Sequence, residues 1–214
     1  MEALFPSAAK LSIQKEISAR EAMKPIRLCI AAMIALLSLA CSSSWNTYSD
    51  DMFHGKRLLR EEDFANARID FLKAAEAQRW PSAYAFAATA SYKMGDLAGA
   101  EQYIAEAERL DGKDYSYVRV LGYKALILLK RGKEEEGQEV LRQYAQVLRS
   151  ISSPMGARQI EIWMRQQQTD LPGLEKLIDQ QVGLYESDVE QYQSTGTGFY
   201  QRRGGFRGGP SIAP

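Results

Sequence analysis

The chain has 214 residues, of which 45% are hydrophobic and 25% are charged, and these proportions indicate one folded domain of ordinary size with appendages. Lys plus Arg and Asp plus Glu each number 27. This balance excludes the interpretation that the chain as a whole is a strongly basic nucleic-acid-binding protein. Two cysteines and one histidine cannot supply the four ligands of a closed Cys/His zinc site. We therefore expect no metal site and no cofactor.

An apolar run without charge spans residues 28–40 and follows Lys24 and Arg27. It is shorter than the roughly 20 apolar residues that a membrane-crossing helix needs. Its length and the two cations before it are typical of a secretory signal peptide that starts at Met23. Residues 1–22 would then be an upstream extension from a misassigned start. The alternative is a cytoplasmic segment in front of an uncleaved anchor.

The apolar run ends in Ser38-Leu39-Ala40-Cys41 and is followed by three serines. This segment resembles the lipobox of bacterial lipoproteins, although it departs from the usual pattern at Leu37 and Ser38. The resemblance implies lipidation (palmitate) of Cys41, and Ser42 implies an outer-membrane lipoprotein that faces the periplasm. Two or three acyl chains would anchor the protein firmly. The alternatives are anchoring in the inner membrane, or an ordinary signal peptide that is cut near Ala40 and releases a soluble periplasmic protein.

Residues 50–190 contain no strand-like alternation and no Asn-Gly hairpin, and they are rich in Ala, Leu, Glu, Lys, Arg and Gln. This composition predicts an all-α fold. Three segments also share one skeleton, in which a helix ends, a turn follows, and small residues recur at fixed offsets. The segments are separated by 33 and 37 residues.

The skeleton resembles the tetratricopeptide repeat, a helix–turn–helix unit of about 34 residues. The third segment departs from the pattern at Gly137 and Tyr144, where two alanines belong. The resemblance implies a helical solenoid of about three repeats over residues 50–150. The matching residues are Gly55, Leu58, Phe64, Ala67, Phe71 and Ala74 in the first unit, Ala88, Gly95, Asp96, Leu97, Ala100, Ile104, Ala107, Leu110 and Asp111 in the second, and Ala125, Leu128, Gly132 and Leu141 in the third.

Three further segments complete the predicted organisation. Residues 41–49 are expected to be a flexible tether. Residues 151–191 are expected to form a capping helix pair, because Ser153-Pro154 is typical of a helix start and Pro172-Gly173 of a break. Residues 192–214, which are rich in Gly and Arg, cannot bury enough surface to fold and are predicted to be disordered.

In proteins with this repeat, the first helices of the units line a concave groove that binds peptides or partner helices. The resemblance places cations and apolar residues on that face, which favours an anionic ligand such as an acidic or C-terminal peptide. Lysines at the positions of Lys93 and Lys130 are also common in the repeat as solvated residues. The predicted partner-binding residues are Lys56, Leu59, Arg60, Thr89, Tyr92, Lys93, Leu126 and Lys130, and the same mapping adds Met52, Ala85, Arg119 and Leu129.

Catalysis has little support, because His54 is the only imidazole and no recognisable nucleophile motif accompanies it. We expect His54 to have a structural role. In the tail, Arg203 and Arg207 begin two RGG units and Arg202 precedes the first, and segments of this type bind single-stranded nucleic acid through charge and stacking. Polyanion or nucleic-acid binding by this tail is therefore the alternative function.

The sequence thus predicts a non-enzymatic, protein-binding scaffold that is lipid-anchored in the bacterial envelope. Its partner would be an envelope protein or peptide held in the groove, with no small-molecule substrate. The scaffold would support assembly of a larger envelope complex of the pilus, secretion or outer-membrane assembly type.

Overall fold

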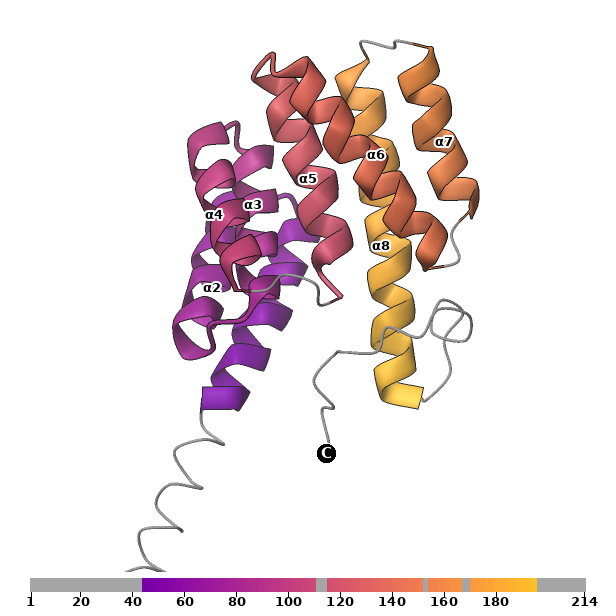
Figure 1. The fold of residues 1–214 in the computed structure, drawn as a ribbon. Helices are drawn as coiled ribbons and strands as arrows, with labels where there is room; N and C mark the ends of the chain where they lie inside the picture. The colour runs from indigo at the N-terminus through magenta and orange to yellow at the C-terminus, as the bar shows by residue number, and fades with distance from the viewer. Residues whose placement is uncertain (1–43, 111–114, 152–153, 167–169, 196–214) are drawn as a thin grey trace, which may run out of the picture. The chain divides into compact units, whose positions relative to one another are not determined.

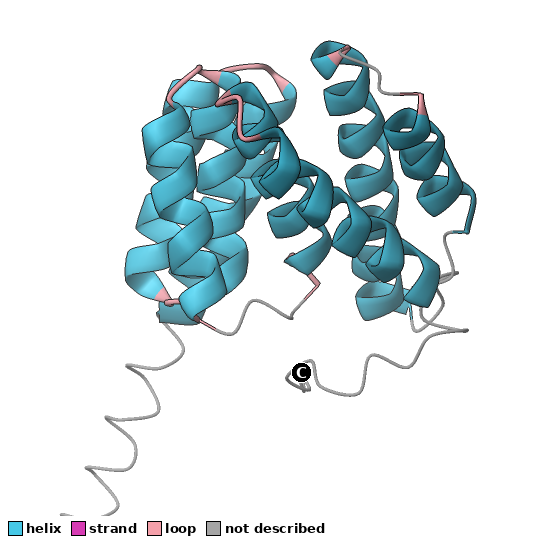
Figure 2. Ribbon diagram, turned by 45° about the horizontal axis from the view of Figure 1, so that its top comes forward, coloured by secondary structure: helices cyan, strands magenta, loops and turns pink. Residues whose placement is uncertain are grey.

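A computed structural model describes residues 44–110, 115–151, 154–166 and 170–195 (Figure 1). All regular secondary structure in these ranges is helical, and this confirms the all-α prediction (Figure 2). None of the helices in these ranges is both long enough and apolar enough to cross a membrane. The predictions for the signal peptide and Cys41, and for Arg202, Arg203 and Arg207 in the tail, lie outside the described residues.

The chain divides into two compact units, residues 1–46 and 47–214, and all packing described below belongs to the second. The first helix covers residues 44–60, so it includes residues 44–49 that were predicted to be a flexible tether. Burial of Tyr48 accounts for this order, because its ring packs on Trp80 and its hydroxyl lies 2.7 Å from Ser82 Oγ. The later helices are α2 (Phe64–Ala77), α3 (Pro81–Lys93), α4 (Leu97–Arg109), α5 (Tyr117–Lys130), α6 (Glu134–Ser150), α7 (Pro154–Arg165) and α8 (Leu171–Thr195).

The first six helices form three consecutive pairs, and a short turn joins the two helices of each pair. The middle residue of each turn has positive φ: 62° at Glu62, 81° at Gly95 and 74° at Gly132. Asp63 and Asp96 follow the first two of these residues, and each side chain accepts a backbone N–H at the start of the next helix. The turn is therefore the same local structure three times, built with glycine in two cases.

Replacing Gly95 by Ala is expected to lower the free energy of unfolding by about 1–2 kcal/mol, because a Cβ disfavours the left-handed backbone. Nothing lies within 4 Å of a Cβ at this position, so backbone strain alone should cause the loss. Urea denaturation measures the effect. Gly183→Ala in the exposed interior of α8 is the matched control, and it should instead stabilise the chain by about 0.5–1 kcal/mol. Equal effects at the two sites would contradict this account of the turn.

Small residues allow the two helices of a pair to approach closely. Ala67, Ala74, Ala100 and Ala107 are completely buried, and a Cβ on Gly55 of the first helix would lie only 2.7 Å from the ring of Phe71 in α2. Each pair packs against the next, since α3 contacts both α2 and α5, and α4 also contacts α5, and one buried apolar core joins α3 to α8. Burial of the apolar side chains in these contacts, large ones such as Phe71, Tyr123 and Leu126 included, is the main stabilising contribution.

The last two helices do not pack mainly on each other. α7 lies against α6, whereas α8 contacts α5 more extensively than it contacts α7 (Figure 1). Gly122 of α5 makes this approach possible, because a Cβ there would lie 2.6 Å from Cγ2 of Ile178 in α8. The segment predicted as a capping pair therefore consists of two helices with different neighbours, and α8 extends to Thr195, beyond the expected end at residue 191.

Candidate functional site

Each first helix of the three pairs contributes one cation that is paired with α8. These cations are Lys56 from residues 44–60, Lys93 from α3 and Arg119 from α5. Together with the aromatic rings beside them, we call these three residues the basic face. Their partners are carboxylates on a single helix, so the cations lie along one side of the molecule.

Arg119 forms the most buried of the pairs. It donates from Nε to Glu186 Oε1 at 2.8 Å and from Nη2 to Glu186 Oε2 at 2.7 Å, and both residues are only 7% exposed. A third donor, Nη1, contacts Thr89 Oγ1 at 3.0 Å, and the guanidinium lies 4.0 Å from the centre of the Phe86 ring. Burial disfavours the charged form of Arg119 and so lowers its pKa, but the pairing with Glu186 has the larger effect and raises the pKa. This fork holds α8 in one register.

Lys93 forms ion pairs with two carboxylates of α8 at the same time. Its Nζ lies 2.5 Å from Glu175 Oε1 and 2.5 Å from Asp179 Oδ2. Burial lowers the pKa of Lys93, but the hydrogen bonds that its ammonium donates to the two carboxylates outweigh this effect and raise the pKa. Two tyrosines add neutral donors, since Tyr92 donates to Glu175 at 3.1 Å and Tyr123 donates to Asp179. The N-terminal part of α8 is thus held by a lysine and two phenols.

Lys56 forms the outermost contact, with Nζ 2.6 Å from Glu190 Oε1. The same ammonium lies 4.9 Å from the centre of the Phe86 ring, within the range of a cation–π contact. The Glu190 side chain is 55% exposed, so this pair contributes less than the buried ones. Lys130 is exposed and lies over the Tyr92 ring at 4.6 Å.

The sequence of α8 explains why its acids meet these cations. An apolar residue is followed directly by an acid at four places: Leu174-Glu175, Ile178-Asp179, Tyr185-Glu186 and Val189-Glu190. The four apolar residues and Val182 are buried, and they recur at helical spacing along a single seam. The acids therefore form a row along one flank of that seam.

The residues predicted to bind a partner have different positions in the structure. Lys56, Tyr92 and Lys93 contact α8 directly, and Thr89 is buried and contacts Arg119. Leu126 is completely buried in the core, Leu59 is half-buried, and Arg60 is exposed. The repeat pattern could not reveal the four acids of α8, because they belong to a segment without that pattern. Their regular placement after apolar residues was the available signal.

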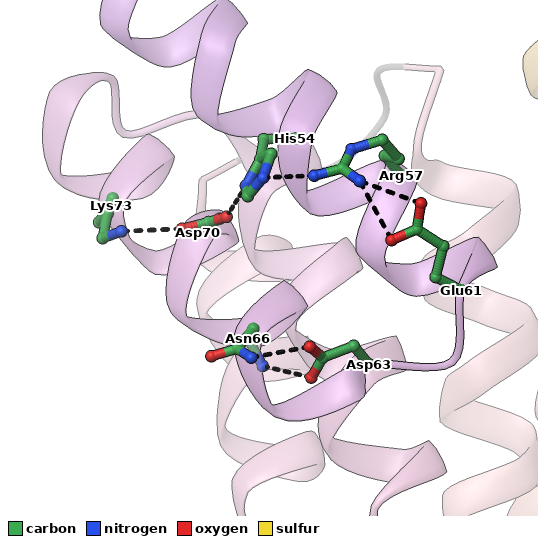
Figure 3. A network of polar contacts seen from close by, with 7 residues as sticks. All are labelled: His54, Arg57, Glu61, Asp63, Asn66, Asp70 and Lys73. Atoms are coloured by element: carbon green, nitrogen blue, oxygen red, sulfur yellow. Dashed lines mark hydrogen bonds and ion pairs between the residues drawn. The ribbon is translucent and has the colours of Figure 1, made fainter.

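His54 belongs to a separate polar cluster between the first helix and α2 (Figure 3). Its Nδ1 contacts Asp70, and its Nε2 lies 2.7 Å from Nη2 of Arg57. Since Arg57 can only donate, these contacts fit a neutral imidazole that donates to Asp70. Lys73 also contacts Asp70 at 2.8 Å, and although burial alone would raise the pKa of Asp70, the Lys73 and His54 hydrogen bonds lower it. The cluster joins two helices, which is a structural role.

Within the described ranges, no three His, Cys, Asp or Glu residues are grouped so that they could hold a metal ion. The basic face and its acidic helix are therefore the main candidate site in this part of the chain. No protein-family model, no curated protein and no solved structure matches the chain, so the basic face itself must indicate the function.

Proposed function

We propose that this chain is a non-enzymatic scaffold that binds a protein partner and is anchored in the bacterial envelope by a lipid on Cys41. In this proposal the three helix pairs are tetratricopeptide-like repeats, and their first helices form the binding surface. One observation carries it: the cations of three successive first helices, with aromatic rings beside them, accommodate an amphipathic helix that bears four carboxylates.

The chemistry of this face favours a helical partner over an extended peptide. Its contacts recur at helical spacing, and the apolar seam beside them is buried. The cations then set register and exclude ligands of the wrong charge. The partner would be an envelope protein with an acidic amphipathic helix, and the complex would support an assembly of the pilus, secretion or outer-membrane type.

Photo-crosslinking in intact cells tests the proposal. A photoreactive residue in place of exposed Lys130, beside Tyr92, should capture a discrete envelope protein, whereas one in place of Arg142 on α6 should not. Lys93→Glu in the same chain should reduce the adduct at least tenfold, because it places a like charge against the acids of the partner. An adduct that is equally strong at both positions, or unchanged by Lys93→Glu, would contradict a specific basic face.

Palmitate labelling tests the anchor separately. The wild-type chain should incorporate the label and sediment with membranes, whereas Cys41→Ser should lose the label because the acceptor thiol is gone. Label that persists in Cys41→Ser, or wild-type chain that stays soluble and keeps residues 1–40, would remove the envelope part of the proposal.

A further inference from the structure

α8 already occupies the basic face in the way that a helical ligand would. We infer that α8 is a displaceable internal ligand, and that the partner is a helix which carries the same pattern and takes its place. The pattern is an apolar residue followed by an acid at positions i, i+4, i+11 and i+15. This inference rests on the proposed function, because it specifies the partner of that same face.

The packing of α8 is that of a docked helix with one buried side. Its buried apolar residues form a single seam, while Leu184 on another side is 57% exposed. α7, its neighbour in sequence, packs mainly on α6, and its polar contacts with α8 include the two that Gln181 Nε2 donates, to Gly156 O at 3.1 Å and to Gln159 Oε1 at 3.2 Å. Release of α8 therefore uncovers one seam and leaves the pairing of α3 with α4 and of α5 with α6 in place.

The charged contacts of α8 can be exchanged for equal ones. A competing helix with the same acids would satisfy Arg119 and Lys93 as α8 does, so no buried cation need remain unpaired in the exchanged state. The exposed pair between Lys56 and Glu190 gives a competitor a first contact. The advantage of α8 is its covalent attachment, which corresponds to an effective concentration on the order of millimolar.

Gly122 adds a steric condition to the charge pattern. Because Gly122 has no side chain, Ile178 fills the space beside it, and Cγ2 of Ile178 lies 2.6 Å from the position that a Cβ on residue 122 would take. The apolar residue before the second acid of a partner must fill this space. The same closeness allows a covalent lock, because cysteines at positions 122 and 178 would have Cβ atoms near the roughly 3.5–4.5 Å of a disulfide.

The test uses a fluorescent peptide with the sequence of residues 170–195 as the probe. The parent is the full chain with Cys29→Ser and Cys41→Ser. The first variant, Glu175→Gln with Asp179→Asn, weakens docking of α8 within the chain, and its sites are partly exposed, so the fold should persist. The second variant, Gly122→Cys with Ile178→Cys, locks α8 when oxidised. Binding is measured by fluorescence anisotropy.

The weakened variant should bind the probe at least tenfold more tightly than the parent, and the oxidised lock should not bind it until it is reduced. Equal affinity for all three chains, or binding to the oxidised lock, would overturn the inference. Amide hydrogen exchange is a second, independent measurement. The backbone amides of α8 should exchange faster than those of α3 and α4, both in the parent and in the weakened variant. Exchange of α8 only together with α3 and α4 would also overturn it.

A matched variant shows where the probe binds. Lys93→Glu added to the weakened variant should abolish probe binding, while Arg142→Glu on α6 should leave it unchanged. A dimer in which two copies of the chain exchange their α8 helices would show that the helix bound to the basic face comes from a second copy. That result would overturn the inference of a different partner protein. Probe binding without any adduct in cells would defeat the proposed function alone. An adduct that survives the oxidised lock would defeat only the displacement of α8.

Discussion

Glu186→Gln is expected to lower the free energy of unfolding by about 3–5 kcal/mol, because it leaves the buried charge of Arg119 without a counter-charge. Both members of the pair are 7% exposed, and Glu186 receives two donors of the guanidinium. Because Glu186 belongs to α8, the loss should appear first as faster amide exchange in α8. Denaturation by urea gives the total, and exchange gives its location.

Two controls separate charge burial from a general effect of mutating α8. Glu190→Gln removes the exposed partner of Lys56 and should cost less than about 1 kcal/mol. Arg119→Met combined with Glu186→Leu removes both buried charges and should recover most of the stability that Glu186→Gln loses. A double variant as unstable as Glu186→Gln would show that the pair is favourable in itself.

The sequence predicted those features that depend on local pattern. Helical composition predicted the all-α class, and the recurrence around Gly95 and Gly132 coincides with turns of positive φ. The repeat resemblance also selected Lys56 and Lys93, because position within a first helix decides which face a side chain occupies. These features follow from neighbours three or four residues apart.

The position of α8 could not be predicted in the same way. Helices that are adjacent in sequence usually pack together, so the sequence predicted that residues 151–191 form a helix pair. In the structure, α8 instead joins α5 across more than 40 residues of sequence, where Gly122 leaves room for Ile178. A single glycine inside a helix pattern does not reveal which distant side chain will fill its place. The order of residues 44–49 has the same origin, since it depends on the contacts of Tyr48 with Trp80 and Ser82.

The fold is expected to unfold cooperatively above about pH 10, because burial raises the pKa of three phenols, those of Tyr92, Tyr123 and Tyr144. A group with a raised pKa in the folded state contributes stability that is complete below its unfolded pKa and is lost as pH rises above it. Each such tyrosine should therefore remove about 1.4 kcal/mol per pH unit in this range. The raised pKa of Lys93 acts in the same direction.

Circular dichroism and tyrosinate absorbance, recorded together against pH, measure this transition. Tyr144→Phe is the informative variant, because the Tyr144 hydroxyl has no hydrogen-bond partner among the described residues. It should keep or raise stability at neutral pH, by up to about 1 kcal/mol, and move the alkaline midpoint upward. Tyr123→Phe removes the donor to Asp179 and should lower neutral stability while it also weakens the pH dependence. Phenols that ionise near their ordinary pKa without loss of helix would contradict this prediction. They would show that solvent reaches the interface between α5 and α8 at high pH without unfolding of the chain.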